Sequence, residues 1–389
     1  MTRGSNHASS SLARRRLKRD QRSGRILELT EAAAPDGSSA GGRFARLPPA
    51  AAFAMLFALL ALIVYGFWLA AHAAPAVPPA HAVNGPKFYG AIVERLRAGQ
   101  DYERAAVAEL RAEGGPLKPF VTVRPPALAM ALSRLPGPSW GSMALKIAAS
   151  AALLAWTLRL SGLGRGALWL GGSLVVFTGL TTPLLGPSGV YLFHEAWAGV
   201  LIALSLALRT DDRWRAAAVV GLLAALVREL AMPYLLVMAL AALAERRRDE
   251  ALGFALALAV AGGALAWHAF AETALTQPGD LASPGWLVLD GWDFVLRTAV
   301  WNLAVAALGA WAAALIVPLA LAGAIDRAGG LGLRLALLLI GYSLGFMIIG
   351  RPSNAYWGLV TAPLIALGLC FAPQAILHLA RAATRRAAS

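Results

Sequence analysis

Residues 50–71 read AAAFAMLFALLALIVYGFWLAA, an apolar stretch that contains no charged side chain. A helix of about 20 residues crosses a hydrocarbon core of about 30 Å, so this stretch is long enough to span a membrane. Inside lipid the backbone polar groups of a single segment can be paired only if that segment is helical. Residues 331–350 form a second long apolar stretch, in which Arg334 is the one charged residue. The sequence therefore predicts an all-α integral membrane protein.

Composition favours the same fold class over the whole chain. Of 389 residues, 58% are apolar and 14% are charged, whereas a soluble domain carries about 25% charged residues. The alternating strands typical of outer-membrane barrels are absent. The net charge of +14 agrees with the positive-inside rule, because basic residues cluster in the tails and short loops. No module for reading nucleic acid is present, so membrane lipid is the expected partner of these charges.

Apolar runs and arginine clusters together predict about ten membrane segments. Eight are expected as full spans at 50–71, 138–159, 164–185, 189–208, 251–271, 299–323, 331–350 and 355–378. The remaining stretch, 216–244, is too short for two full crossings. A single crossing would place Arg246, Arg247 and Arg248 on the wrong side. We therefore expect two short helices in a hairpin that turns near Arg228, Glu229 and Pro233.

The tails and the transmembrane domain have distinct compositions. Residues 1–46 predict a disordered, basic cytoplasmic tail, or alternatively a surface helix on anionic lipid. Residues 47–380 form the expected transmembrane domain, and 381–389 a basic C-terminal tail. The positive-inside rule places both termini in the cytoplasm.

The loop at 75–137, outside the membrane after the first span, is predicted to be a helical cap. Phe88, Ile92 and Leu96 recur at helical spacing, and Gly99 ends that helix. Asp101 stands at the N-cap of a second helix, Tyr102–Glu113, which is followed by two glycines. Pro125 and Pro126 open a third helix running to Leu135. A second loop outside the membrane is expected at 272–298.

Ionisable side chains within membrane segments are the first candidates for function, because burying each one costs energy. They are Lys146, His194, Glu195, Arg228, Glu229 and His268.

Several of these groups, and also Arg351 in the loop between the last two spans, could have a structural role instead of a functional one. Glu195 could act as a base or hold a metal, or be a carboxylate tolerated near the interface. Arg228 could clamp a phosphate with its planar fork, or tie the hairpin to its neighbours. Lys146 could bind phosphate or extend to the interface, and Arg351 could bind an anion or anchor its loop. His268 is expected to pack at the interface.

The ordered set of motifs resembles the GT-C superfamily of membrane glycosyltransferases, and within it a bacterial group assigned to cell-surface glycopolymer formation. The motifs are Asn84-Gly-Pro-Lys-Phe-Tyr89 followed by Gly99-Gln-Asp-Tyr102, Arg124-Pro-Pro, His194-Glu195-Ala-Trp197, Arg228-Glu229-Leu-Ala-Met-Pro-Tyr234 and Arg351-Pro-Ser-Asn-Ala-Tyr356-Trp357. The resemblance implies inverting transfer of a sugar from a polyprenyl-phosphate donor to a glycan, lipid or protein acceptor. It also implies the bacterial inner (plasma) membrane as the location.

The resemblance also implies a set of site residues. Asn84 occupies the position where relatives carry the catalytic acid, and an amide cannot act as a base. Either Glu195 or Asp101 replaces it, or the chain has lost this chemistry. Substrate-binding roles are implied for His194, Arg228, Glu229, Lys146, Tyr89, Tyr102, Arg124, Arg351 and Tyr356.

Two other functions stay open at this point. One is a transporter or flippase for lipid-linked intermediates, although paired repeats of the kind transporters show are absent. The other is a non-catalytic assembly subunit. No ligand spacing diagnostic of a metal is present, which leaves a requirement for a divalent cation open.

Overall fold

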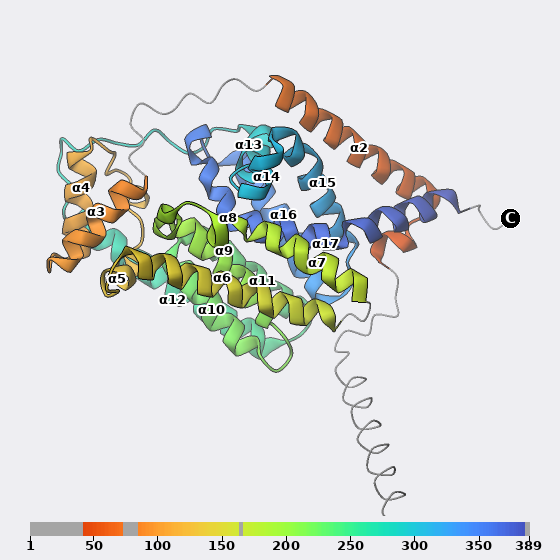
Figure 1. The fold of residues 1–389 in the computed structure, drawn as a ribbon, viewed down its shortest axis with the longest axis horizontal. Helices are drawn as coiled ribbons and strands as arrows, with labels where there is room; N and C mark the ends of the chain where they lie inside the picture. Colours follow the sequence, from red (N-terminus) through yellow and green to blue (C-terminus); the bar gives the residue numbers. More distant parts are fainter. Residues whose placement is uncertain (1–41, 73–84, 163–165, 386–389) are drawn as a thin grey trace, which may run out of the picture. The chain divides into compact units, whose positions relative to one another are not determined.

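The computed structural model describes residues 42–72, 85–162 and 166–385. These residues fold into α-helices and short 3-10 helices (Figure 1), and the β-structure among them is limited to two isolated bridges. The predicted all-α class is therefore confirmed.

Among the described residues, five helical segments are long and apolar enough to cross a membrane. They are α2 (Pro49–His72), α6 (Pro138–Ser161), α12 (Arg248–Thr273), α16 (Gly329–Ile348) and α17 (Gly358–Thr384) with the 3-10 helix η5 (Pro352–Trp357) before it. Five shorter helices are also apolar: α7 (Gly166–Gly179), α9 (His194–Leu208), α10 (Trp214–Val227), α11 (Met232–Ala244) and α15 (Ala310–Asp326). The ten-span count itself stays a prediction.

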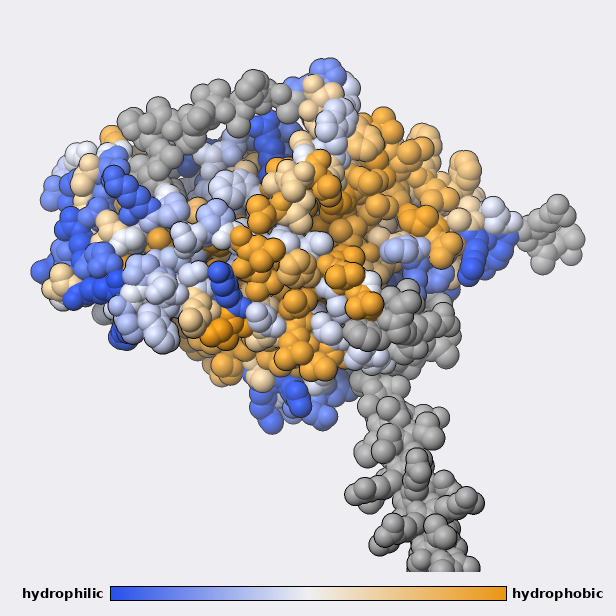
Figure 2. Space-filling view, in the orientation of Figure 1, coloured by the Kyte–Doolittle hydropathy of each residue, from blue (hydrophilic) through white to orange (hydrophobic). Residues whose placement is uncertain are grey.

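The outward faces of these helices are apolar. On α2, Phe53 and Phe57 are 68% and 67% exposed. Figure 2 shows apolar surface gathered over the apolar helices named above, whereas the surface over two other helices, α3 (Pro86–Arg97) and α4 (Tyr102–Ala112), is hydrophilic. Soluble monomers rarely expose apolar patches this extensive, so the surface has the character that contact with lipid requires.

The predicted cap helices are confirmed. With α3 and α4, the 3-10 helix η2 (Phe120–Thr122) and α5 (Ala127–Ser133) form a small unit, which we call the cap. Phe88, Ile92 and Leu110 lie in its own hydrophobic core. Gly99 and Gly114, which end α3 and α4, have φ of +88° and +65°, a region that favours glycine.

The two predicted outer loops meet at the same end of the helices, which we call the cap end. The Leu117 amide donates to the Leu281 carbonyl at 2.9 Å, and the Ser283 amide donates to the Lys118 carbonyl at 2.6 Å. Their common position agrees with the predicted placement of both loops on one side.

The predicted hairpin at 216–244 is present. α10 ends at Val227, Arg228 is extended, and η4 (Glu229–Ala231) leads into α11. The two helices pack closely at Gly221, where a Cβ would lie 2.9 Å from the Leu235 side chain. The chain turns at the cap end and returns to the other end, which we call the opposite end.

Several boundaries differ from the sequence prediction. The expected span 299–323 is divided into the end of α13 (Gly291–Ala299), α14 (Leu303–Leu308) and α15. Asn302 caps the start of α14, and Gly309, with φ of +88°, separates α14 from α15. The expected loop 272–298 therefore contains most of an amphipathic helix, α13.

The predicted span 164–185 is divided into α7 and α8 (Thr181–Leu185), and η3 (Ser188–Leu192) precedes α9. The predicted N-terminal tail is shorter than expected, because η1 (Arg43–Arg46) is ordered and Phe44 is buried. The Phe44 amide donates to Asp326 Oδ1 at 2.8 Å. The predicted C-terminal tail, 381–389, is also shorter than expected, because α17 continues to Thr384. Residues 1–41 and 386–389, which make up the rest of the predicted tails, lie outside the described residues.

Candidate functional site

A buried ion pair lies where α9 begins and the α10–α11 hairpin turns. Arg228 Nε donates to Glu195 Oε1 at 2.6 Å, and the two side chains are 1% and 2% exposed. Glu195 stands in the first turn of α9, where the helix dipole favours negative charge. Arg228 also pairs with Glu229, and its guanidinium lies 6.0 Å from the centre of the Trp357 ring. The break in the hairpin thus places a charged pair inside an apolar bundle.

Arg124 approaches the same carboxylate from the cap. Its Nε lies 3.9 Å from Glu195 Oε1, and its Nη2 donates to the Tyr356 hydroxyl at 2.5 Å. Tyr89 of α3 also hydrogen-bonds to the Arg124 side chain. Burial raises the pKa of the Tyr89 phenol, which keeps that hydroxyl neutral. Two guanidinium groups and two phenols therefore surround one carboxylate.

Some polar atoms of this site have no partner among the described residues. They include Nε of Arg124, Oε2 of Glu229 and a ring nitrogen of His194, a residue that is 2% exposed and whose ring also contacts the Leu192 backbone. The His194 ring lies 5.0 Å from the Tyr89 ring. It also lines a small cavity with Tyr89, Tyr102 and apolar side chains of the cap. A buried polar group without a hydrogen-bond partner destabilises the fold by about 1–3 kcal/mol. A ligand or water that hydrogen-bonds to these atoms would therefore bind favourably.

The site suits anion binding better than proton abstraction in its present state. Arginine forks bind phosphate and carboxylate groups in a bidentate manner. Glu195 Oε1 already accepts a hydrogen bond from Arg228 and lies 3.9 Å from Arg124 Nε, so this oxygen is engaged by cations. The two arginines and the two carboxylates, Glu195 and Glu229, balance in charge.

The sequence-predicted site residues fall into two groups. The structure brings together His194, Glu195, Arg228, Glu229, Tyr89, Arg124 and Tyr356, and it places Tyr102 beside them through a hydrogen bond from its hydroxyl to the Arg124 carbonyl at 2.6 Å.

The remaining candidates lie elsewhere. Asp101 is exposed and caps α4 by accepting a hydrogen bond from the Arg104 amide at 3.0 Å. Lys146 is exposed on α6. Arg351 donates to the Ser283 hydroxyl at 3.1 Å and lies 5.5 Å from the centre of the Trp286 ring. Asn84 lies outside the described residues.

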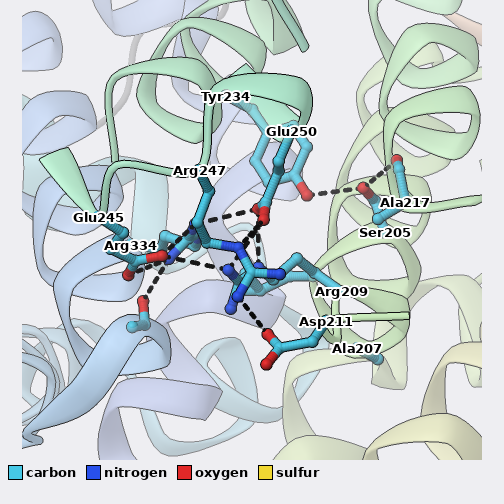
Figure 3. Close-up of polar contacts among 12 residues, drawn as sticks. Ser205, Ala207, Arg209, Asp211, Ala217, Tyr234, Glu245, Arg247, Glu250 and Arg334 are labelled. Carbon is cyan, nitrogen blue, oxygen red and sulfur yellow. Dashed lines mark hydrogen bonds and ion pairs between the residues drawn. The ribbon is translucent and has the colours of Figure 1, made fainter. Parts of the chain in front are cut away.

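A second buried ionic network lies at the opposite end, and sequence reasoning missed it (Figure 3). Glu250, which is 1% exposed, accepts hydrogen bonds from Arg209, Arg247 and Arg334 at 2.7–3.0 Å. Arg334, which is fully buried, also donates to both oxygens of Glu245 at 2.6 and 3.0 Å. A lone arginine inside the apolar run 331–350 was the available signal, because a buried cation needs a partner.

This network is balanced in charge and tied to structure. Arg209, Arg247 and Arg334 face Glu245, Glu250 and Asp211, with Arg247 donating to Asp211 at 2.5 Å. It joins the α9–α10 turn, the α11–α12 turn and the first turns of α16. We therefore assign it a structural role.

No group of three or more His, Cys, Asp or Glu side chains within the described ranges is arranged to hold a metal ion.

Comparison of the chain with protein families, with curated proteins and with solved structures found no match. Function must therefore be argued from the site itself.

Proposed function

We propose that the chain is a multi-pass glycosyltransferase of the bacterial inner membrane, with both termini in the cytoplasm. It would move a sugar from a polyprenyl-phosphate donor to an acceptor glycan, lipid or protein, with inversion. The observation that carries the proposal is the convergence of Arg124 and Arg228 on Glu195 beneath the cap. Arg124 is 6% exposed and Arg228 is 1% exposed. Two buried guanidinium groups, one from the cap and one at the end of the apolar helix α10, suit a phosphate attached to a hydrocarbon chain.

The geometry suggests how the donor would bind. The prenyl chain would lie against the apolar helices, and its phosphate would pair with Arg124 and Arg228. The sugar would then face the cap, near Tyr89 and His194. In this arrangement the unpaired Nε of Arg124 and an unpaired ring nitrogen of His194 gain partners.

Donor binding would also change the state of Glu195. In the unliganded site this carboxylate is held by Arg228 at 2.6 Å. A phosphate that takes over the guanidinium groups would release it. A released carboxylate beside a bound sugar can accept the proton of an acceptor hydroxyl, which is the role of a general base.

One observation favours a second candidate, a non-catalytic subunit that binds a lipid-linked glycan. Glu195 accepts a hydrogen bond from Arg228 and is not free to take up a proton in this state. At position 84 the chain has an asparagine, whereas the family that it resembles carries an acid there. If Glu195 stays paired when the donor binds, the site holds the lipid without promoting transfer.

Binding is tested with purified protein in nanodiscs and a polyprenyl phosphate. We expect Arg124→Lys and Arg228→Gln to weaken binding by about tenfold or more, because a bidentate contact is lost. Lys146→Gln is the matched control, since it removes an exposed cation, and it should bind like the wild type. Absence of binding by the wild type, or normal binding by both arginine variants that elute as folded protein, overturns the proposal.

Transfer of a labelled sugar from its polyprenyl-phosphate carrier separates the two candidates. The enzyme predicts transfer by the wild type and its loss in Glu195→Gln, with donor binding retained. Binding without transfer by the wild type identifies the non-catalytic subunit.

A further inference from the structure

Two buried carbonyl groups flank the side chain of Arg124. Val123 is 3% exposed and extended, and Arg124 is 6% exposed. Pro125 and Pro126 follow, so the next two residues offer no backbone N–H, and the residue before a proline is held out of the helical region. This segment therefore belongs to neither a helix nor a sheet, and its carbonyl oxygens need partners from side chains.

Two side chains from different helices supply these partners. The Tyr102 hydroxyl of α4 donates to the Arg124 carbonyl at 2.6 Å. His268 Nε2 of α12 lies 3.2 Å from the Val123 carbonyl oxygen. Because a carbonyl only accepts, His268 must donate this hydrogen bond through Nε2–H. The two rings are 6.1 Å apart.

The other side of the imidazole shows what holds it in place. His268 is 1% exposed, and Nδ1 has no hydrogen-bond partner among the described residues. Glu103 Oε1 lies 4.0 Å from Nδ1, beyond hydrogen-bonding distance. In the described part of the chain, the orientation of the His268 ring is thus fixed by its bond to the Val123 carbonyl.

We propose that Tyr102 and His268 are positioning residues for Arg124. Their bonds fix the peptide groups on both sides of the Arg124 Cα and so direct the guanidinium toward Glu195 and Tyr356. The positioning of Arg124 does not depend on the proposed function. The expected effect on polyprenyl-phosphate binding rests on that function. It gives Tyr102 a role through Arg124 in place of direct contact with substrate. His268 is more than the packing residue expected from sequence.

A measurement without ligand tests the positioning itself. In ¹⁵N-arginine-labelled protein in nanodiscs, the Arg124 Nε–H resonance is assigned by its absence from Arg124→Lys. We expect Tyr102→Phe and His268→Leu to shift or broaden it. His268→Gln keeps an N–H near the position of Nε2 and should retain it. Tyr234→Phe is the matched control, since that buried hydroxyl pairs with Ser205 at 2.6 Å, far along the chain from Arg124.

Binding of a polyprenyl phosphate to the same variants gives the second readout. Tyr102→Phe and His268→Leu should bind about tenfold more weakly, the loss expected for one buried hydrogen bond. Neither should weaken binding further in the Arg124→Lys background. His268→Gln and Tyr234→Phe should bind like the wild type.

The outcomes separate the two proposals. An unchanged Arg124 resonance together with unchanged affinity in Tyr102→Phe and His268→Leu overturns the positioning role. If the resonance moves while the wild type binds no polyprenyl phosphate, the positioning role stands and the proposed function fails.

Discussion

Replacing Glu250 by glutamine should destabilise the protein more than any other single isosteric change at the opposite end. The carboxylate is 1% exposed and accepts from three arginines. Glutamine has nearly the same volume, so the change adds almost no cavity. It leaves an excess positive charge in the buried network and points an amide N–H₂ at guanidinium groups. Removing one partner of a buried ion pair costs about 3–5 kcal/mol, and we expect about 4 kcal/mol here.

The assay is equilibrium unfolding in mixed detergent micelles, followed by circular dichroism. Asp211→Asn serves as the control, because Asp211 pairs with Arg247 but its side chain is 55% exposed. An exposed pair of this kind contributes less than about 1 kcal/mol. A double variant, Glu250→Leu with Arg334→Met, removes one charge of each sign. It should recover at least half of the loss, because well-packed apolar side chains can replace a buried ion pair.

Two results would refute the reasoning. If Glu250→Gln unfolds at the same detergent composition as the wild type, the network contributes little to stability. If the double variant is less stable than Glu250→Gln, charge balance is not what the network provides.

Two further predictions concern packing and pH. Gly323→Ala should lower the free energy of unfolding by about 1–3 kcal/mol, because the new Cβ would lie 2.1 Å from the Gly368 carbonyl oxygen and push α15 away from α17. Gly341→Ala is the control, because nothing lies within 4 Å of the Cβ that it adds. Equal thermal unfolding midpoints for the two variants would contradict this prediction. The Arg111 guanidinium, hydrogen-bonded to Asp280, lowers the pKa of that carboxyl from 3.8 to about 2. The folded pKa is thus below the unfolded one, so this pair stabilises the cap fully above about pH 4, and its contribution is lost as the pH falls through about 2. Hydrogen exchange of the Leu117 and Ser283 amides measures this effect, because these amides join the cap to the loop that contains Asp280. The wild type should protect them more than Asp280→Asn does at about pH 4, and the difference in protection should shrink toward about pH 2. A difference that stays constant over this range would contradict the prediction.

Much of the fold could be predicted because its signals are local. The helix at 86–97 follows from apolar spacing, and the helix after Asp101 follows from a capping residue. The hairpin at Arg228 follows from counting residues against membrane thickness and from the side on which arginines must lie. α13 was missed because its short amphipathic pattern was assigned to an interfacial loop. Its buried face contains Val295 and Leu296.

The ionic networks illustrate what sequence reasoning could not supply. Arg209 has the local appearance of an ordinary flanking residue of a membrane segment. It is paired with Glu250, 41 positions away, and Arg334 with the same carboxylate, 84 positions away. Pairing over such separations leaves no local pattern. The cluster of Arg124, Glu195 and Arg228 was anticipated as a set of candidates, but the pairing of Glu195 with arginine was not.

The length of α12 has a consequence for how the chain can vary. This single helix carries Glu250 in its first turn and His268 near its far end. Both contacts need a fixed side-chain direction, so the separation of 18 residues, about 27 Å at 1.5 Å per residue, sets their relative orientation as well as their distance. Inserting one residue would rotate one contact by about 100° relative to the other and break it. Adaptation to a thicker bilayer through α12 would therefore require whole helical turns, whereas helices without paired ends could lengthen residue by residue or tilt.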